Sequence, residues 1–112
     1  MSKEHLGEFE ELVLLMIILL GDDAYGLAIR TALKEHANRS TTIGAVHATI
    51  NRLQKKGYIE SSFGGESDLR GGRKKRLLRI TNVGKQMLEK SQEMKVSLWS
   101  KIPAMALQNS KS

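Results

Sequence analysis

The stretch "TTIGAVHATINRLQKKGYIES", residues 41–61, decides the fold. Val46, Ile50 and Leu53 recur at the i, i+4 and i+7 spacing of a helix with one buried stripe. The side of the helix away from that stripe carries Gly44, Ala48, Asn51 and Lys55, with His47 and Arg52 at its edges. Gly57 follows, where a left-handed residue commonly ends a helix. The small residues of the outward face leave room for a partner to approach closely.

Two further helices are predicted before this stretch. Residues 8–20 contain the run "LVLLMIILL" and predict a helix that is apolar on every side. "GDDAYGLAIRTALKEHA", residues 21–37, predicts a second helix with Asp22 or Asp23 as its cap. The expected caps of the third helix are Ser40, Thr41 and Thr42.

A β-hairpin and a last helix are predicted after the stretch. "YIESSF" (58–63) and "RLLRI" (76–80) are strand candidates, and the glycine-rich "GGESDLRGGRKK" (64–75) is the expected flexible tip between them. Thr81 is placed to cap a fourth helix that runs to about Ile102, ahead of Pro103. The predicted fold is mainly α with a small β-hairpin. It comprises a winged helix-turn-helix domain (1–81), a C-terminal dimerisation helix (82–103) and a flexible tail (104–112).

The composition argues against several classes of protein. The chain has 112 residues, which fits one domain, and no cysteine, which removes disulfides and thiolate zinc sites. Its three histidines are dispersed without the spacing of a triad or a metal site, so we expect no enzyme activity and no cofactor. The apolar run is too short to span a membrane, and the acidic segment before it is unlike a signal peptide. We therefore expect a cytoplasmic protein without a membrane partner.

The positive charge is concentrated in the middle of the chain. The net charge is +6, but residues 1–35 carry three basic residues against seven acidic ones. Residues 36–85 carry eleven Lys or Arg against three acids. A segment with so large a positive balance is typical of a surface that binds a polyanion.

The first and last helices indicate a homodimer. A helix that is apolar all round needs cover on every side, and one small domain cannot supply it. The last helix adds a stripe of Met and Leu at helical spacing. The residues expected at the subunit interface are Leu12, Met16, Leu19, Met87, Met94 and Leu98.

Three stretches in order resemble the PadR family of bacterial transcription regulators. "LLGDDAYGLAI" (19–29) resembles the junction of its first two helices, and residues 41–61 resemble its recognition helix and first wing strand. "GGRKKRLLRITNVGK" (71–85) resembles its second wing strand and the start of its last helix. The resemblance covers residues 9–98, and the single C-terminal helix is similar to the compact branch of the family. It implies a winged helix-turn-helix homodimer that usually represses transcription.

The resemblance also bears on two individual residues. The family commonly has Thr-Val-Tyr where this chain has Ala45-Val46-His47, so His47 stands in place of a Tyr that often contacts DNA. Some members bind planar aromatic effectors between the subunits. Trp99, the sole Trp, therefore has two interpretations. Either its ring packs at the subunit interface, or it lines such an effector pocket.

The third helix and the hairpin supply the expected contacts to double-stranded DNA. Asn51 and Arg52 are expected to read or position bases in the major groove, whereas the hairpin cations contact phosphates or a narrow minor groove. The expected DNA-binding residues are Thr41, Thr42, Gly44, His47, Ala48, Asn51, Arg52, Lys55, Arg70, Arg73, Lys74, Lys75 and Arg76. We expect a sequence-specific dimer on a pseudo-palindromic operator. A nonspecific or architectural nucleic-acid-binding protein stays open as an alternative. A winged helix that contacts another protein is disfavoured by the clustered charge.

Overall fold

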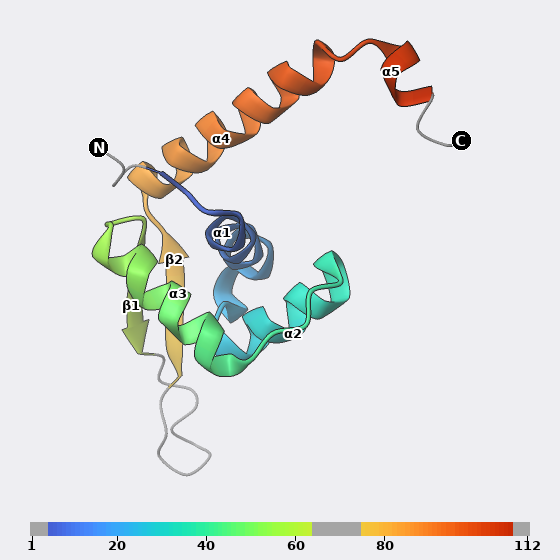
Figure 1. Ribbon diagram of the computed structural model, residues 1–112. Coiled ribbons are helices and arrows are strands. Elements are labelled where there is room, and N and C mark those ends of the chain that lie inside the picture. The colour runs from blue at the N-terminus through green and yellow to red at the C-terminus, as the bar shows by residue number, and fades with distance from the viewer. Residues whose placement is uncertain (1–4, 64–74, 109–112) are drawn as a thin grey trace.

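The structure is a computed structural model that describes residues 5–63 and 75–108 of the chain (Figure 1). Its elements in chain order are α1 (Glu8–Leu20), a 3-10 turn η2 (Gly21–Asp23), α2 (Gly26–Ala37), α3 (Ile43–Lys55), β1 (Ile59–Phe63), β2 (Arg76–Ile80), α4 (Asn82–Ser100) and α5 (Ala104–Gln108). Three helices, an antiparallel hairpin and a long last helix make a winged helix-turn-helix fold, as the sequence predicts.

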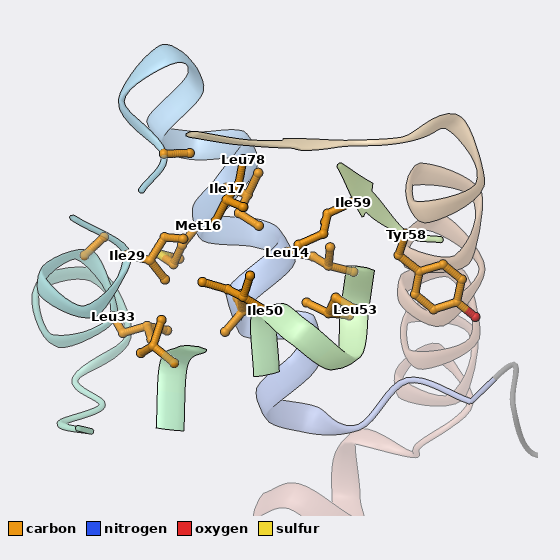
Figure 2. Packing of buried hydrophobic residues seen from close by; sticks show 14 of the residues in the cluster. Leu14, Met16, Ile17, Ile29, Leu33, Ile50, Leu53, Tyr58, Ile59 and Leu78 are labelled. Carbon is orange, nitrogen blue, oxygen red and sulfur yellow. The ribbon is translucent and has the colours of Figure 1, made fainter. Parts of the chain in front are cut away.

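The hydrophobic core is built around α1, which contacts α2, α3, β2 and α4. Figure 2 shows side chains from α1, α2, α3 and the hairpin directed into one cluster. Leu14, Ile29, Leu33, Ile50 and Leu53 are fully buried in it. Each such side chain contributes about 1.5–3 kcal/mol relative to an exposed one. The buried stripe predicted for residues 41–57 is therefore confirmed.

The start of α2 differs from the prediction. Asp22 and Asp23 lie in the exposed turn η2 and do not cap α2, whose N-cap residue is Tyr25. The cause is the backbone at Ala24, whose carbonyl accepts a 2.8 Å hydrogen bond from the N–H of Leu78 in β2. Because Ala24 pairs with the hairpin in this way, α2 begins only after the chain has passed the strand.

The two ends of α3 follow the prediction. The Thr42 hydroxyl accepts a 3.0 Å hydrogen bond from the Ala45 N–H and so caps the helix. Gly57, with φ of +81°, lies just beyond the other end, where L side chains are strained. The turn at Gly57 brings Tyr58 back to the core, where it is buried.

The hairpin is fastened at its base to the start of α4. Its register pairs Ile59 with Ile80 at the base and Phe63 with Arg76 at the last described pair. The Thr81 hydroxyl donates to the Gly57 carbonyl at 2.7 Å and accepts from the Gly84 N–H at 3.0 Å, so it joins the α3 turn to α4.

The last helices depart from the prediction at their boundaries. α4 ends at Ser100 rather than near Ile102, and residues 104–108 of the expected tail form the short helix α5. Pro103 explains both boundaries, because it disfavours helical backbone in the residue before it and favours the first turn of a new helix. The Ala106 N–H donates to the Pro103 carbonyl at 3.0 Å. Figure 1 shows the second half of α4 and α5 projecting away from the body of the fold.

The residues expected at a subunit interface are not equally exposed. Met16 is buried in the protomer's own core, and Leu12 and Met87 are half-buried. Leu19, Met94 and Leu98 are exposed. Further exposed apolar side chains lie close to them in sequence: Ile18, Val96, Trp99, Ile102, Met105 and Leu107. Most exposed large apolar side chains of the described residues therefore lie at the end of α1 and along the second half of α4 and α5; the others are Leu27, Ile43, Phe63 and Val83.

Across the described residues, no single helix has the length and apolar character of a membrane span. The segment Glu8–Asp23 together with α2 reaches that length and composition as a pair, with a bend of 119° between the two.

Candidate nucleic-acid interface

The outward face of α3 is exposed over its whole length. Gly44, Ala48, Asn51 and Lys55 are all exposed, as their spacing predicts. A Cβ atom added at Gly44 would meet only the Thr42 hydroxyl oxygen, at 3.9 Å. Packing within the protomer therefore does not require a glycine there. The missing side chain instead leaves the start of α3 open to close approach.

His47 lies on the side of α3 that meets α2. A Cβ atom added at Gly26, the first residue of α2, would lie 2.9 Å from Cε1 of the His47 ring. The lack of a side chain at Gly26 is what allows the exposed imidazole to rest there. The His47 ring thus lies between the start of α2 and the outward face of α3. The first N–H groups of α2 carry partial positive charge.

The hairpin is tied to α3 through one arginine. Arg76, the first residue of β2, donates from its guanidinium to Asn51 Oδ1 at 3.3 Å and to Gln54 Oε1 at 2.6 Å. The Ser61 hydroxyl of β1 donates to the same Gln54 oxygen at 3.3 Å. Asn51, Gln54, Lys55 and Arg76 together line a hollow of about 280 Å³ between helix and hairpin. The structure thus brings together two DNA-contact candidates on α3 and one on the wing.

The start of the wing strand is also held against α2. Lys75 Nζ lies 4.3 Å from the centroid of the Tyr25 ring, a cation–π contact. Lys75 and Arg76 therefore point to different neighbours, one to α2 and the other to α3. The remaining wing candidates, Arg70, Arg73 and Lys74, lie outside the described residues.

Arg52, an expected base contact, lies beside α1 in this structure, with its side chain still 54% exposed. Its Nε atom lies 3.4 Å from Oε2 of Glu10 in α1, and its guanidinium donates to the Thr49 hydroxyl at 3.1 Å. The side chain therefore lies along the side of α3 that faces α1, whereas Asn51 lies on the side of the hairpin. Arg52 helps to hold α3 in place and does not share a face with Asn51.

Glu10 is the acceptor that organises this side of α3. Its buried carboxylate accepts from Lys56 Nζ at 3.0 and 3.1 Å and from the Gly7 N–H at 2.9 Å. Burial by itself raises the pKa of Glu10. The Gly7 N–H, Lys56 and Arg52 outweigh that effect, so the pKa of Glu10 lies below its ordinary value.

Two candidates at the start of α3 have structural bonds of their own. The Thr42 hydroxyl caps the helix, and the Thr41 carbonyl accepts from Arg30 Nε at 3.0 Å. Thr42 is exposed and Thr41 half-exposed, so both lie on the surface next to Gly44.

Sequence reasoning missed three residues of this surface. Gln54 was left out, although at about 100° per residue it lies next to His47 on the same side of the helix. Tyr25 and Gly26 were assigned only to the helix junction. No spacing in the sequence indicates that they meet Lys75 and His47, because those contacts are tertiary.

The assembled surface can bind a polyanion in two ways. Lys55, Lys75 and Arg76 place fixed positive charge around the exposed face of α3, which suits phosphates. The amides of Asn51 and Gln54 can hydrogen-bond the edges of bases in the major groove. Within residues 5–63 and 75–108, no group of three or more His, Cys, Asp or Glu side chains is arranged to hold a metal ion.

A family model and one relative match most of the chain. Residues 14–90 match the transcriptional regulator PadR-like family. A protein of Lysinibacillus sphaericus without an assigned function is 34% identical over 84 residues, which cover 73% of this chain and 72% of that protein.

Solved structures show the same fold. A PadR-like transcriptional regulator from Bacillus cereus superposes with a TM-score of 0.70 at 23% identity, covering 90% of this chain and 91% of the other. A PadR family transcription regulator from Clostridium difficile gives a TM-score of 0.64 at 26% identity, covering 80% and 91%.

Proposed function

The chain belongs to the PadR-like family of transcriptional regulators, and from that premise we propose that it is a sequence-specific DNA-binding repressor that acts as a homodimer. The observation that carries the proposal is the surface where α3 meets the wing. There, donors of Asn51, Gln54, Lys55 and Arg76 surround one hollow beside a helix face that is otherwise small and exposed. A helix with this face fits the major groove, and the adjoining wing cations fit phosphates.

The homodimer is supported by the apolar surface of the protomer. Leu98 and Trp99 are 55% and 64% exposed on the projecting half of α4, and Leu19 is 57% exposed at the end of α1. Monomeric soluble proteins rarely expose large apolar patches, so side chains as exposed as these suggest surfaces that a partner covers. A two-fold axis would pair each protomer's surface with its copy and present two α3 helices to the two halves of a pseudo-palindromic operator.

Repression and effector binding are the finer parts of the proposal. Repression is the activity that the resemblance to the family implies. Trp99 supports an effector site only if its ring is still accessible in the dimer, and a ring packed between subunits would be structural. Quenching of Trp99 fluorescence by planar aromatic compounds, measured on the dimer, distinguishes these two roles.

Selection of bound duplexes from random DNA by the purified protein tests the proposed function. We expect enrichment of one pseudo-palindromic site, with tight binding that unrelated duplexes do not compete away. A reporter with this site inside its promoter should then lose transcription when the protein is expressed. Binding without any enrichment would refute the proposal and favour a nonspecific, architectural role.

A further inference from the structure

The hydrogen bonds of Arg76 fix which way two amide side chains face. A guanidinium has only donors, so an amide that meets it must present its carbonyl oxygen. Asn51 and Gln54 both do so, with Oδ1 and Oε1 accepting from Arg76 at 3.3 and 2.6 Å. This orientation follows from the chemistry of arginine, which has no acceptor.

Gln54 is fixed more firmly than Asn51. Its oxygen accepts a second hydrogen bond, from the Ser61 hydroxyl at 3.3 Å, so its lone pairs are both engaged. Among the residues that the structure describes, no acceptor is bonded to the amide nitrogen of either side chain. The N–H donors of both amides are therefore free, and Gln54, whose oxygen lone pairs are both used, can offer a ligand only donors.

The hollow around Gln54 is therefore lined by hydrogen-bond donors. It is lined by the two amides, the Lys55 ammonium and the Arg76 guanidinium, which retains further N–H groups beyond the two that it uses. Its walls are exposed, and the helix face beside it is the one that fits the major groove. A ligand for such a hollow must present acceptors.

The four bases differ in what they present in the major groove. Guanine has two adjacent acceptors, N7 and O6, whereas adenine has one acceptor beside a donor. Thymine has one acceptor beside a methyl group, and cytosine has a donor. We propose that the hollow reads a guanine in each half-site, with Gln54 as the reading residue and Arg76 as a positioning residue that keeps the Gln54 amide nitrogen outward. The inference rests on the proposed function and specifies the base that it reads.

The two amides differ in how they can meet adenine. A bidentate pair with adenine needs the Asn51 oxygen to accept from adenine N6, but Arg76 already donates to that oxygen. Asn51 keeps its second lone pair and can still accept from adenine N6 while Arg76 stays in place. Adenine is therefore disfavoured only beneath Gln54, whose oxygen already accepts from both Arg76 and Ser61.

Replacement of guanine by 7-deazaguanine tests the proposal directly, because it removes the N7 acceptor and keeps Watson–Crick pairing. The substrate is the duplex selected by the wild-type protein, with each guanine replaced in turn, and the readout is the ratio of dissociation constants for modified and unmodified duplex. We expect at least one guanine in each half-site at which the wild-type ratio is about tenfold, within the range of a good base contact.

Variants at Gln54 identify the reading residue. Gln54→Met removes the amide without adding charge, and Gln54→Glu still accepts from Arg76 but can no longer donate. Both should bring the ratio at the sensitive guanine to about one, while Glu60→Gln on the exposed side of β1 should leave it at the wild-type value. A tenfold ratio that persists in Gln54→Met would overturn the assignment of Gln54.

A variant at Arg76 tests its positioning role. Arg76→Lys keeps the charge but lacks the planar fork that meets both amide oxygens. We expect selection with this variant to admit adenine at the guanine position when each affinity is divided by the variant's own affinity for random DNA. Unchanged selection of guanine would overturn the positioning role. A wild-type protein that selects a site without a sensitive guanine would refute this inference and leave the proposed function standing, whereas no selection at all would refute the proposed function itself.

Discussion

Replacing Glu10 by Gln should destabilise the fold, because Glu10 joins α1 to α3. Its side chain is 8% exposed and meets Lys56, Arg52 and the Gly7 N–H at the junction of α1 and α3. Glutamine keeps the shape and one carbonyl acceptor, but it loses the charge and the second acceptor. The matched control is Glu8→Gln on the same helix, where the carboxylate is 71% exposed and meets Arg39 at 2.7 Å.

The expected magnitude follows from the partners that lose their acceptor. A hydrogen bond to a charged group contributes about 1.5–3 kcal/mol, and the pair with Lys56, which is 26% exposed, is the most protected of the set. Lys56 is not stranded by the change, because it also donates to the His5 carbonyl at 3.2 Å. The decrease in unfolding free energy should therefore stay below the ~3–5 kcal/mol that results when one partner of a buried ion pair is removed. We expect a decrease in unfolding free energy of about 1.5–3 kcal/mol for Glu10→Gln and of about 0–1 kcal/mol for the exposed pair of Glu8.

The difference between wild type and Glu10→Gln should depend on pH in one direction. The pKa of Glu10 in the folded protein lies below its ordinary value of 4.5, so the unfolded chain binds more protons between the two pKa values. The contribution of Glu10 is complete above the unfolded-state pKa and is lost as the pH falls through the folded-state pKa. Glutamine does not titrate, so the difference between the two proteins should shrink as the pH is lowered from 6 to about 3.

Urea unfolding of the wild type and both variants, followed by circular dichroism at a fixed protein concentration, measures these differences. Equal effects at Glu8 and Glu10 would show that burial of the carboxylate does not matter. A difference between wild type and Glu10→Gln that stayed constant down to pH 3 would contradict the lowered pKa. Either result would refute the view that Glu10 holds α3 against α1 through its charge.

Three further predictions concern packing, the wing and the dimer. Gly84→Ala should lower stability by about 1–3 kcal/mol in urea unfolding, because its Cβ would overlap a backbone carbonyl, whereas Gly44→Ala should leave stability unchanged and weaken DNA binding. Replacing Arg73 and Lys74 by Ala should reduce the slope of log affinity against log salt from about −7 to about −4, measured by fluorescence anisotropy, while the order of preferred sequences is kept; an unchanged slope would make these cations simple solvated charge. Leu98→Asp should weaken dimerisation at least about tenfold in sedimentation experiments without unfolding the protomer, because Leu98 is exposed there.

The core of the fold could be predicted because burial follows a period. Val46, Ile50 and Leu53 were assigned to the buried side of α3 from spacing alone, and all three are buried. Thr42 and Thr81 cap α3 and α4 as predicted, because capping depends on residue type and on positions within one turn. Features that depend on a few neighbouring residues were therefore within reach of the sequence.

The predicted start of α2 was wrong because a long-range hydrogen bond outweighed a local capping preference. Asp22 and Asp23 are favourable cap residues, and a local rule places the helix directly after them. The structure instead extends the backbone at Ala24 so that its carbonyl meets β2, which lies more than fifty residues further along the chain. A rule based on neighbouring residues cannot predict a hydrogen bond to so distant a strand.

The partners of the cations around α3 could not be predicted from the sequence either, because they too are tertiary contacts. They matter more for function than the start of α2 does. Periodicity places Arg52 at the edge of the outward face, but it does not tell whether the side chain turns to DNA or to α1. The buried Glu10 decides this, because a carboxylate removed from water attracts the nearest cation. Arg76 lies against the amides of α3 for a similar reason, because a guanidinium has five N–H donors and bonds to the acceptors near it. The position of each arginine is thus set by the acceptors that the fold brings beside it: Glu10 of α1 for Arg52, and the amides of α3 for Arg76.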